Sequence, residues 1–396
     1  MERYDVAIIG GGPAGTSAGL NVAKYGLKAV IFEKAKYPRD KPCGGVLSFR
    51  TDDLLGDVAL SHMNCKVTRL DIYSPSLKKI SIPNKRGHFV IRSEFDAAMA
   101  KDARKSGVEI FDVCPVSKIT RLESGEYEVA SGKKVVTARY VVMATGVQNN
   151  KLIKDLGIRK KWPEGHLARC AESETAVENE ILDRINDNDK TLSVFFGVVP
   201  SGYGWYFVKD GYLNVGIGSF WHDIKEQSPN QIYEDFVNLL RKEGLVPEGL
   251  ALNRPRHHLL AFKKPAKKTV FDRVVLVGDA AGFVNPVTGE GLYYSILSGK
   301  LAAKAIRGDS EGDMSLESYE ESWQRAFGRD LAGPALFLQK VAYKSRGGME
   351  LIVALGRHDE KMADIFRQVV FGEDEYKNII RKMVLRVPIS MFKSIF

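Results

Sequence analysis

Residues 4–34, YDVAIIGGGPAGTSAGLNVAKYGLKAVIFEK, decide the fold. The apolar run at 6–9 predicts a buried parallel strand. A helical pattern follows over 14–25 and stops at Gly26, a residue typical of a helix end. The apolar run at 29–32 predicts a second buried strand. This order of strand, glycine turn, helix and strand predicts a Rossmann-type α/β unit.

The turn Gly10-x-Gly12-x-x-Gly15 predicts a dinucleotide site. Gly10 permits a tight turn, Gly12 lets the backbone approach a pyrophosphate, and Gly15 lets helix and strand pack closely. The helix that begins near Ala14 offers free N–H groups and the positive end of its dipole to phosphates. The alternative is a chance glycine-rich turn, but the strand before it and the helix after it favour nucleotide binding.

Glu33 strengthens this prediction because it ends the second strand eighteen residues after Gly15. At that distance a carboxylate can bond ribose hydroxyls, and Lys34 beside it is assigned to the same site. The motif alone does not separate NAD from FAD.

Residues 273–306, RVVLVGDAAGFVNPVTGEGLYYSILSGKLAAKAI, favour FAD. A predicted strand ends in Gly278 and Asp279, which places a carboxylate near a ribityl chain. The Gly289-x-Gly291 turn opens a helix at Leu292, whose N–H groups would face the flavin edge that becomes anionic on reduction. The alternative for Asp279 is a turn or helix cap.

Composition narrows the choice of partners. The 396 residues are enough for two or three joined units, and 44% hydrophobic with 27% charged residues is ordinary for a globular enzyme. The net charge of +9 suits nucleic acid, anionic lipid or a phosphorylated substrate, and a generic basic surface is equally compatible. No nucleic-acid motif accompanies the charge, so we expect no nucleic-acid partner.

Four scattered cysteines lack metal-ligand spacing, so we expect no metal site and a reducing compartment. We find neither a targeting signal at the start nor about 18 consecutive apolar residues, and therefore expect a cytoplasmic protein.

Several of these motifs resemble FAD enzymes of the para-hydroxybenzoate hydroxylase-like superfamily. They are GGGPAG, Glu33, GDAAGFVNPVTGEG and a strand at 141–146 that ends in Ala-Thr-Gly. The resemblance implies FAD as cofactor, with Gly146 at the second crossing of the nucleotide domain. It also implies that Arg92 contacts FAD and that Val116 offers backbone contacts to the adenine. A surface arginine near a helix start is the alternative for Arg92.

Two further stretches are similar to the geranylgeranyl reductase family, which reduces isolated C=C bonds in polyprenyl chains. They are PRDKPCGGV at 38–46 and Pro-x-x-Tyr-x-Trp-x-Phe at 200–207, and the resemblance covers roughly residues 1–310. The family continues with Phe-Pro where this chain has Val208 and Lys209, which leaves the exact substrate open.

The resemblance also implies that Cys43 lies beside the flavin, where Gly44 and Gly45 permit close backbone approach. Cys43 then either shapes the substrate cavity or donates a proton, since a cysteine thiol is mostly protonated at neutral pH. A bystander role is the third reading. Tyr203 is a second, weaker candidate for a catalytic role.

Residues 200–218, PSGYGWYFVKDGYLNVGIG, carry an unusual number of rings. Strand alternation would place Tyr203, Trp205 and Phe207 on one face and Tyr206 on the other. A prenyl chain offers no hydrogen bonds and must be bound by buried area, at roughly 25 cal/mol per Å². We therefore predict that the three rings form a substrate wall; ordinary packing within a sheet is the alternative.

The predicted architecture is an α/β chain of three parts. Residues 1–150 and 269–310 form the FAD-binding domain, 151–268 a mixed-sheet substrate domain, and 311–396 a C-terminal helical region. The last segment interleaves apolar residues with a set of basic ones and is predicted to stop being helical at Pro388. It either lies on an anionic membrane surface or packs over the substrate domain. The basic residues are Lys377, Arg381, Lys382, Arg386 and Lys393.

Taken together, the motifs predict an FAD-dependent reductase of a geranylgeranyl or polyprenyl chain, carried on a lipid or a diphosphate. No second glycine fingerprint appears, so the external electron donor stays open among NAD(P)H, a ferredoxin and a quinol. An FAD monooxygenase or halogenase acting on an aromatic substrate and a flavin electron-transfer protein are the alternatives, because fold likeness does not decide between them.

Overall fold

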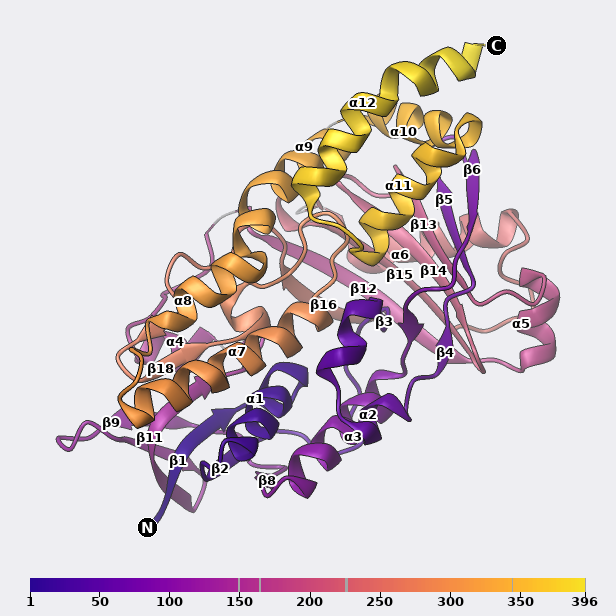
Figure 1. The fold of residues 1–396 in the computed structure, drawn as a ribbon. Coiled ribbons are helices and arrows are strands. Elements are labelled where there is room, and N and C mark those ends of the chain that lie inside the picture. Colours follow the sequence, from indigo (N-terminus) through magenta and orange to yellow (C-terminus); the bar gives the residue numbers. More distant parts are fainter. Residues whose placement is uncertain (149, 164, 225–226, 344, 396) are drawn as a thin grey trace.

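The glycine-rich stretch lies at the centre of an eight-stranded sheet (Figure 1). It folds as β1 (Glu2–Ile9), α1 (Pro13–Lys24) and β2 (Ala29–Phe32). On its other side β1 pairs in parallel with β11 (Lys134–Met143), and β11 pairs in parallel with β18 (Val274–Leu276). A strand from the far end of the chain therefore completes the nucleotide-binding sheet.

The computed structural model describes residues 1–148, 150–163, 165–224, 227–343 and 345–395. The edges of the first sheet are formed by β8 (Glu109–Phe111) and β17 (Val270–Phe271), and β10 (Tyr127–Ser131) with β9 (Lys118–Arg121) extends from β11. Helix α1 packs against α3 (Arg92–Lys105) and α7 (Leu292–Glu311). Gly299 allows the close contact with α7, because a Cβ there would lie 2.4 Å from the Ala14 carbonyl oxygen.

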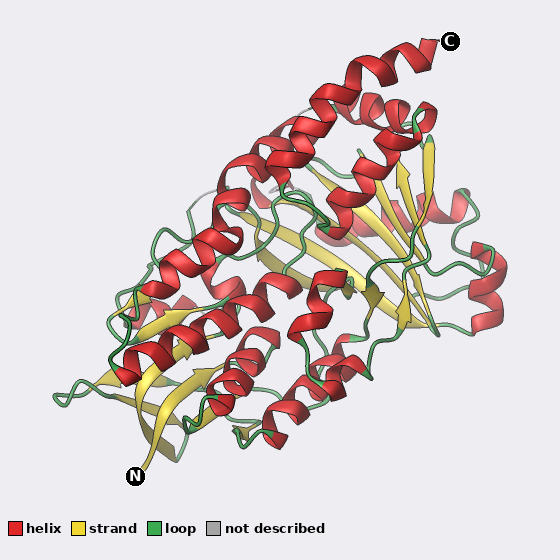
Figure 2. Ribbon diagram, in the orientation of Figure 1, coloured by secondary structure: helices red, strands yellow, loops and turns green. Residues whose placement is uncertain are grey.

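A second, seven-stranded sheet stands beside the first (Figure 2). Its order is β16 (Arg256–Ala261), β12 (Leu167–Ala176), β15 (Tyr212–Phe220), β14 (Gly202–Lys209), β13 (Thr191–Phe196), β5 (Arg69–Tyr73) and β6 (Lys79–Pro83). All neighbours are antiparallel except β13 and β5, so the sheet is mixed, as predicted.

The expected boundary at residue 150 does not match this pairing. Strands β5 and β6 lie within 1–150 yet form one edge of the second sheet. Their apolar residues alternate with polar ones, a pattern that indicates a half-buried strand but not which sheet it joins. The small sheet of β3 (Val46–Leu47), β7 (His88–Phe89) and β4 (Cys65–Lys66) and the short helix α2 (Asp57–Leu60) lie in the same part of the chain.

The two faces of the second sheet bury different cores. On one face Tyr206 packs with α5 (Asn179–Asn186) and α6 (Pro229–Lys242). On the other face Trp205 and Phe207 pack with the C-terminal helices. The predicted alternation along β14 is therefore confirmed.

The C-terminal part is helical, as expected. It contains α8 (Ser318–Trp323), α9 (Leu336–Tyr343), α10 (Arg346–His358), α11 (Glu360–Phe371) and α12 (Tyr376–Ile395); α4 (Asn150–Asp155) lies earlier in the chain. The prediction that Pro388 ends the last helix is wrong, because Pro388 lies inside α12. Val384, whose carbonyl loses its helical partner there, is exposed and open to water. Within the described residues no helix is both long and apolar enough to cross a bilayer.

Candidate functional site

One cavity of about 850 Å³ runs between the two sheets and beneath the C-terminal helices. Its wall includes every site residue that the sequence predicts except Gly15 and Gly278. Those two glycines serve packing: a Cβ at Gly15 would lie 1.9 Å from the Gly10 carbonyl oxygen, and one at Gly278 would lie 2.9 Å from the Ala14 Cβ. The predicted residues therefore lie around one space, although their individual roles remain predictions.

The glycine loop forms one end of the cavity. Gly10, Gly12 and Ala14 line it, and Gly12 caps the N-terminus of α1 without a side chain. The first N–H groups of the helix are therefore not occupied by a capping side chain, and the positive end of the helix dipole lies at the cavity. This end is suited to an anion such as a pyrophosphate.

Glu33 and two arginines form the polar wall beside this loop. The Glu33 carboxylate is buried and accepts a hydrogen bond from the Gly11 N–H at 2.9 Å. Arg39 Nη1 lies 3.1 Å from Asp96, which also accepts two hydrogen bonds from Arg92, at 2.8 and 2.9 Å. Arg39 and Arg92 thus share Asp96, and Arg39 also lies beside Glu33, so this wall sets two arginines next to two carboxylates.

Two polar atoms in this wall lack hydrogen-bond partners within the described residues: Arg39 Nε and Thr145 Oγ1. Arg39 Nε lies 3.4 Å from Glu33 Oε2 but makes no hydrogen bond there. Buried polar atoms are almost always hydrogen-bonded, so these two indicate a site built for a polar ligand.

Asp279 and the loop before α7 form the middle of the cavity. A Cβ at Gly291 would lie 3.3 Å from Asp279 Oδ1, which places the carboxylate next to the N-terminus of α7. Burial acts to raise the pKa of Asp279, but the nearby His258, Lys41 and Arg92 side chains outweigh it and lower the pKa. Asp279 is therefore ionised at neutral pH.

Lys41 and His258 complete this polar middle section. Lys41 Nζ lies 2.7 Å from His258 Nε2, and burial lowers the pKa of Lys41 to about 8 and lowers the pKa of His258. At neutral pH a charged Lys41 and a neutral His258 are compatible with this contact, since the imidazole can accept a hydrogen bond from the ammonium group. Sequence analysis did not single out Lys41, although it lies within the PRDKPCGGV stretch.

Aromatic rings line the cavity beyond this point. Tyr203 and Trp205 lie with ring centroids 6.0 Å apart, and Trp205 and Phe207 lie 6.3 Å apart. Gly216 makes room for the Trp205 ring and Gly44 for the Phe207 ring, because a Cβ would lie 2.1 and 2.6 Å from them. The glycines of this region thus let large rings pack flat against the sheet and the Cys43 loop.

The far end of the cavity is apolar on all sides. The second sheet contributes four side chains and the C-terminal helices most of the rest. They are Ile72, Leu192, Val194 and Phe196 from the sheet, and Leu338, Ala342, Tyr343, Ile352, Phe366, Val369, Val370 and Met383 from the helices. None carries a charge, so this end suits a long apolar group.

The two candidate catalytic residues lie between the polar and apolar ends. Cys43 lines the cavity and its Sγ accepts the Gly45 N–H at 3.3 Å. The Tyr203 hydroxyl donates to the Thr288 carbonyl at 2.6 Å, and burial raises the pKa of Tyr203 above its ordinary value. The Tyr203 proton is therefore engaged and weakly acidic, which favours a positioning role over proton donation.

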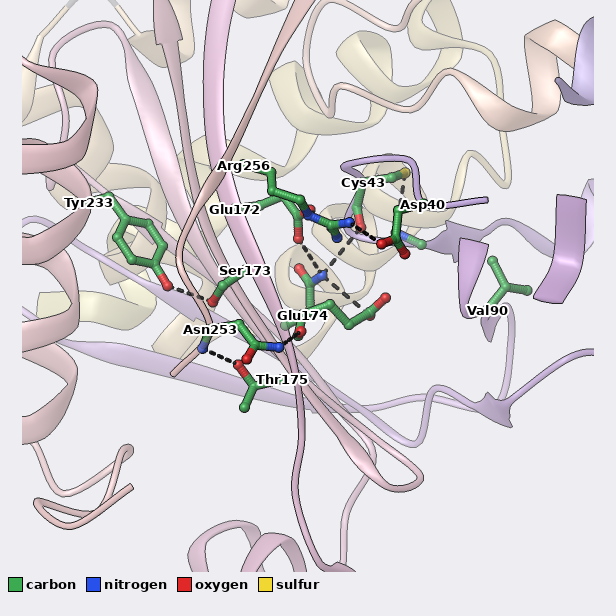
Figure 3. A network of polar contacts seen from close by, with 12 residues as sticks. Asp40, Cys43, Val90, Glu172, Ser173, Glu174, Thr175, Tyr233, Asn253 and Arg256 are labelled. Carbon is green, nitrogen blue, oxygen red and sulfur yellow. Dashed lines mark hydrogen bonds and ion pairs between the residues drawn. The ribbon is translucent and has the colours of Figure 1, made fainter. Parts of the chain in front are cut away.

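Sequence analysis did not predict a set of buried polar groups behind the aromatic wall (Figure 3). Glu172 lines the cavity, Trp205 Nε1 donates to Asn214 Oδ1 at 2.7 Å, and the fully buried Lys209 pairs with Glu174. The four consecutive polar residues 172–175 of β12 were the available signal, but such a run does not say which of its side chains meets a cavity.

The chain matches a family model described as an FAD binding domain over residues 3–329. The chain belongs to this family. It is an FAD-dependent oxidoreductase, and the predicted cofactor is confirmed.

Curated relatives and solved structures narrow the likeness. The chain is 28% identical to the digeranylgeranylglycerophospholipid reductase of Methanocaldococcus jannaschii, over 82% of this chain and 83% of that one. It is 28% identical to the chloroplastic geranylgeranyl diphosphate reductase of Oryza sativa subsp. japonica, over 96% and 82%. The fold is that of a geranylgeranyl bacteriochlorophyll reductase-like protein from Thermoplasma acidophilum, with a TM-score of 0.80, 22% identity and coverage of 97% and 99%.

The residues present fit FAD. The dipole of α1 and the cations Arg39 and Arg92 suit the pyrophosphate, Glu33 suits a ribose, and Asp279 suits the ribityl chain. The N-terminus of α7 at Gly291 suits the flavin edge that gains negative charge on reduction. When bound, FAD would supply a hydride or single electrons at this point of the cavity.

Proposed function

We propose that this oxidoreductase reduces isolated C=C bonds of a geranylgeranyl or longer polyprenyl chain. The observation that carries the proposal is the shared cavity: the aromatic face of β14 and the apolar end continue from the residues that fit FAD. An apolar chain can gain free energy there only by burying area, and flat rings supply that area at little cost in side-chain entropy.

The reduction adds one hydride and one proton across an alkene that no carbonyl polarises. A dry cavity supports this chemistry because it excludes water from the reacting carbons and strengthens electrostatic interactions. Two of the named relatives act on geranylgeranyl chains joined to a glycerophospholipid and to a diphosphate. We propose the same class of chain here, with the polar headgroup outside the apolar end.

The test is a direct assay of the product. The purified yellow protein is reduced with dithionite under anaerobic conditions and mixed with geranylgeranyl diphosphate or with a geranylgeranylated glycerophospholipid in detergent. We expect product masses that rise by two hydrogens per reduced bond. Reduced protein that turns over only when oxygen is admitted would point to a monooxygenase. Reduced protein that consumes neither the prenyl substrate nor oxygen would point to an electron carrier.

The physiological electron donor is a separate part of the proposal. We propose an external donor that supplies two electrons per reduced bond, in one step or in two, because the dinucleotide fingerprint at Gly10–Gly15 is accounted for by FAD and the sequence has no second one. Replacing dithionite in turn by NADH, NADPH, a reduced ferredoxin or a quinol measures which of them reduces the flavin.

We also propose that the C-terminal helices contact a membrane surface from which such a lipid enters. Phe337 on α9, Leu351 on α10, and Val384 and Leu385 on α12 are exposed apolar side chains, and these helices pack together. The contact would be mainly apolar, because Lys382 pairs with Asp374 and Arg386 with Asp359. The Lys393 side chain lies outside the described residues.

Vesicle sedimentation checks this contact. We expect the wild type to sediment with anionic vesicles and the double variant Val384→Asp, Leu385→Asp to remain in solution with its flavin. Equal sedimentation of both would remove α12 from the proposed membrane contact.

A further inference from the structure

Glu172 is a buried acid that the motifs do not explain. It lies on β12 opposite Arg256 of β16, is 2% exposed, and lines the cavity. Cys170, two residues earlier on the same strand, lines the same wall. A buried carboxylate depends on the cations and hydrogen-bond donors around it, because burying a charge without such partners is costly.

The surroundings of Glu172 hold too few cations for its carboxylate (Figure 3). Lys209 is committed to Glu174 and to the Val90 carbonyl, 3.1 Å away. Arg256 divides its guanidinium between Glu172 Oε1 and Asp40 Oδ2, each at 3.1 Å. The carboxylates of Glu172, Glu174 and Asp40 therefore share only two cations, Lys209 and Arg256. The charged and titratable groups around Glu172 are Arg256, Glu174, Lys209, Asp40, Cys170 and Tyr233.

This arrangement moves the titration of Glu172 toward neutral pH. Burial, with Glu174 adding to it and Arg256 and Lys209 opposing it, raises the pKa of Glu172 to about 7. A carboxylic acid with this pKa can both give up and regain a proton at neutral pH.

Glu172 is also joined to the Cys43 loop and to the aromatic wall. Asn214 Nδ2 donates to Glu172 Oε2 at 3.0 Å and to the Cys43 carbonyl at 3.3 Å, so both groups contact one nitrogen atom. The other end of the same amide, Oδ1, accepts the Trp205 indole N–H. The acid thus lines the cavity and is linked through one amide to both the Cys43 loop and the Trp205 ring.

We propose that Glu172 is the proton donor of the reduction, an inference that rests on the proposed function. In this step the C=C π bond is lost and two C–H bonds form. One carbon receives a hydride from reduced FAD, which leaves the FAD oxidised. The neighbouring carbon receives the proton of the Glu172 carboxyl group, which leaves a carboxylate paired with Arg256.

The acid can regain its proton from water. The Arg256 and Asp40 side chains are 37% and 80% exposed, so the ion pair at Glu172 Oε1 reaches the protein surface within two residues. The external donor reduces FAD again with two electrons, supplied together or one at a time, and completes the cycle.

The first test compares Glu172→Gln with Glu180→Gln, the same change at an exposed position at the start of α5. The rate measured is that of anaerobic flavin reoxidation by a geranylgeranyl substrate. In the wild type we expect this rate to fall as pH rises through about 7, because the acid form is lost. Glu172→Gln should be about 100-fold slower or more and lose that pH dependence, and Glu180→Gln should behave as wild type.

The proposal would be overturned if Glu172→Gln had the same rate and the same pH profile as the wild type. A rate that falls equally at all pH values while the wild-type profile is flat near pH 7 would also overturn it and leave Glu172 a positioning residue.

A second measurement needs no substrate and separates this proposal from the proposed function. Infrared difference spectra of the FAD-bound protein between pH 5 and 9 should contain the C=O stretch of a protonated carboxylic acid that disappears near pH 7. The band should be absent from Glu172→Gln and present in Glu180→Gln. If the band is found but no prenyl substrate reoxidises the flavin, the proposed function fails while Glu172 still holds its proton; if the band is missing, the proton donor is wrong whatever the substrate.

Discussion

The two ends of the cavity are built in different ways. The polar end consists of short turns, such as 10–15 and 278–292, in which backbone N–H groups and a few charges are placed by local geometry. The apolar end gathers single side chains from Ile72 to Met383, which only tertiary packing brings together. The comparison teaches that a phosphate site can be read from a few adjacent residues, whereas an apolar site depends on the whole fold. Substitutions at the two ends should therefore separate cofactor binding from substrate binding.

The largest effect is expected at the apolar end. Trp205→Ala removes a buried ring and its hydrogen bond to Asn214, and should lower the free energy of unfolding by about 3 kcal/mol. FAD content should stay at the wild-type level while reduction of a prenyl substrate falls, because the wall is lost and the nucleotide end is untouched. Urea unfolding, flavin absorbance and product mass check the three parts. Loss of FAD in this variant would contradict the separation of the two ends.

At the polar end we expect a substitution to reduce FAD binding directly. Gly15→Ala forces a Cβ against the Gly10 carbonyl oxygen and should cost about 1–3 kcal/mol and most of the bound FAD. Gly347→Ala is the matched control, because a Cβ at that helical position meets nothing within 4 Å. Flavin per protein after purification measures the outcome. Full FAD content in Gly15→Ala would show that helix–strand packing does not set the site.

A smaller effect is expected where the two ends meet. Tyr203→Phe removes the hydroxyl that donates to the Thr288 carbonyl and should cost about 1 kcal/mol, with turnover within a few-fold of wild type. Stability and rate are measured on the same preparation. A loss of about 100-fold in turnover with normal stability would instead make Tyr203 a proton donor.

The last prediction concerns the pH dependence of stability at Lys41. Its pKa of about 8 in the folded chain lies below the ordinary lysine value, so the unfolded chain holds the proton to higher pH. The stability of the wild type relative to Lys41→Met should then rise between about pH 8 and 10, by about 2 kcal/mol. Urea unfolding of the flavin-free proteins at pH 7 and pH 10 tests this, and a difference that does not change with pH would show that Lys41 is not buried in its charged form.

The same contrast explains how much could be predicted from the sequence. The place of Gly10, Glu33 and Asp279 beside the cavity could be predicted because each lies within three residues of the end of a strand, and that of Gly291 because it precedes a helix; their roles toward FAD stay predictions. The face of β14 that carries Trp205 was also predictable, since strand alternation is strict.

Other features could not be predicted from the sequence, because they depend on the three-dimensional fold. The pairing of β5 and β6 with the second sheet depends on a partner more than 100 residues away. Likewise Glu172 meets Arg256 and Asn214 only through strand pairing, and Pro388 is tolerated within α12 where the freed carbonyl of Val384 is open to water.

The central claim is that a prenyl chain lies against the aromatic wall and beneath the C-terminal helices. The most direct measurement is photo-crosslinking of the FAD-bound protein with a geranylgeranyl diphosphate analogue that carries a diazirine near the end of its chain, followed by peptide mass spectrometry. The account predicts label within residues 338–383 and 192–207, displaced by excess unlabelled geranylgeranyl chain. Label confined to exposed surface peptides, or label that excess chain does not displace, would contradict it.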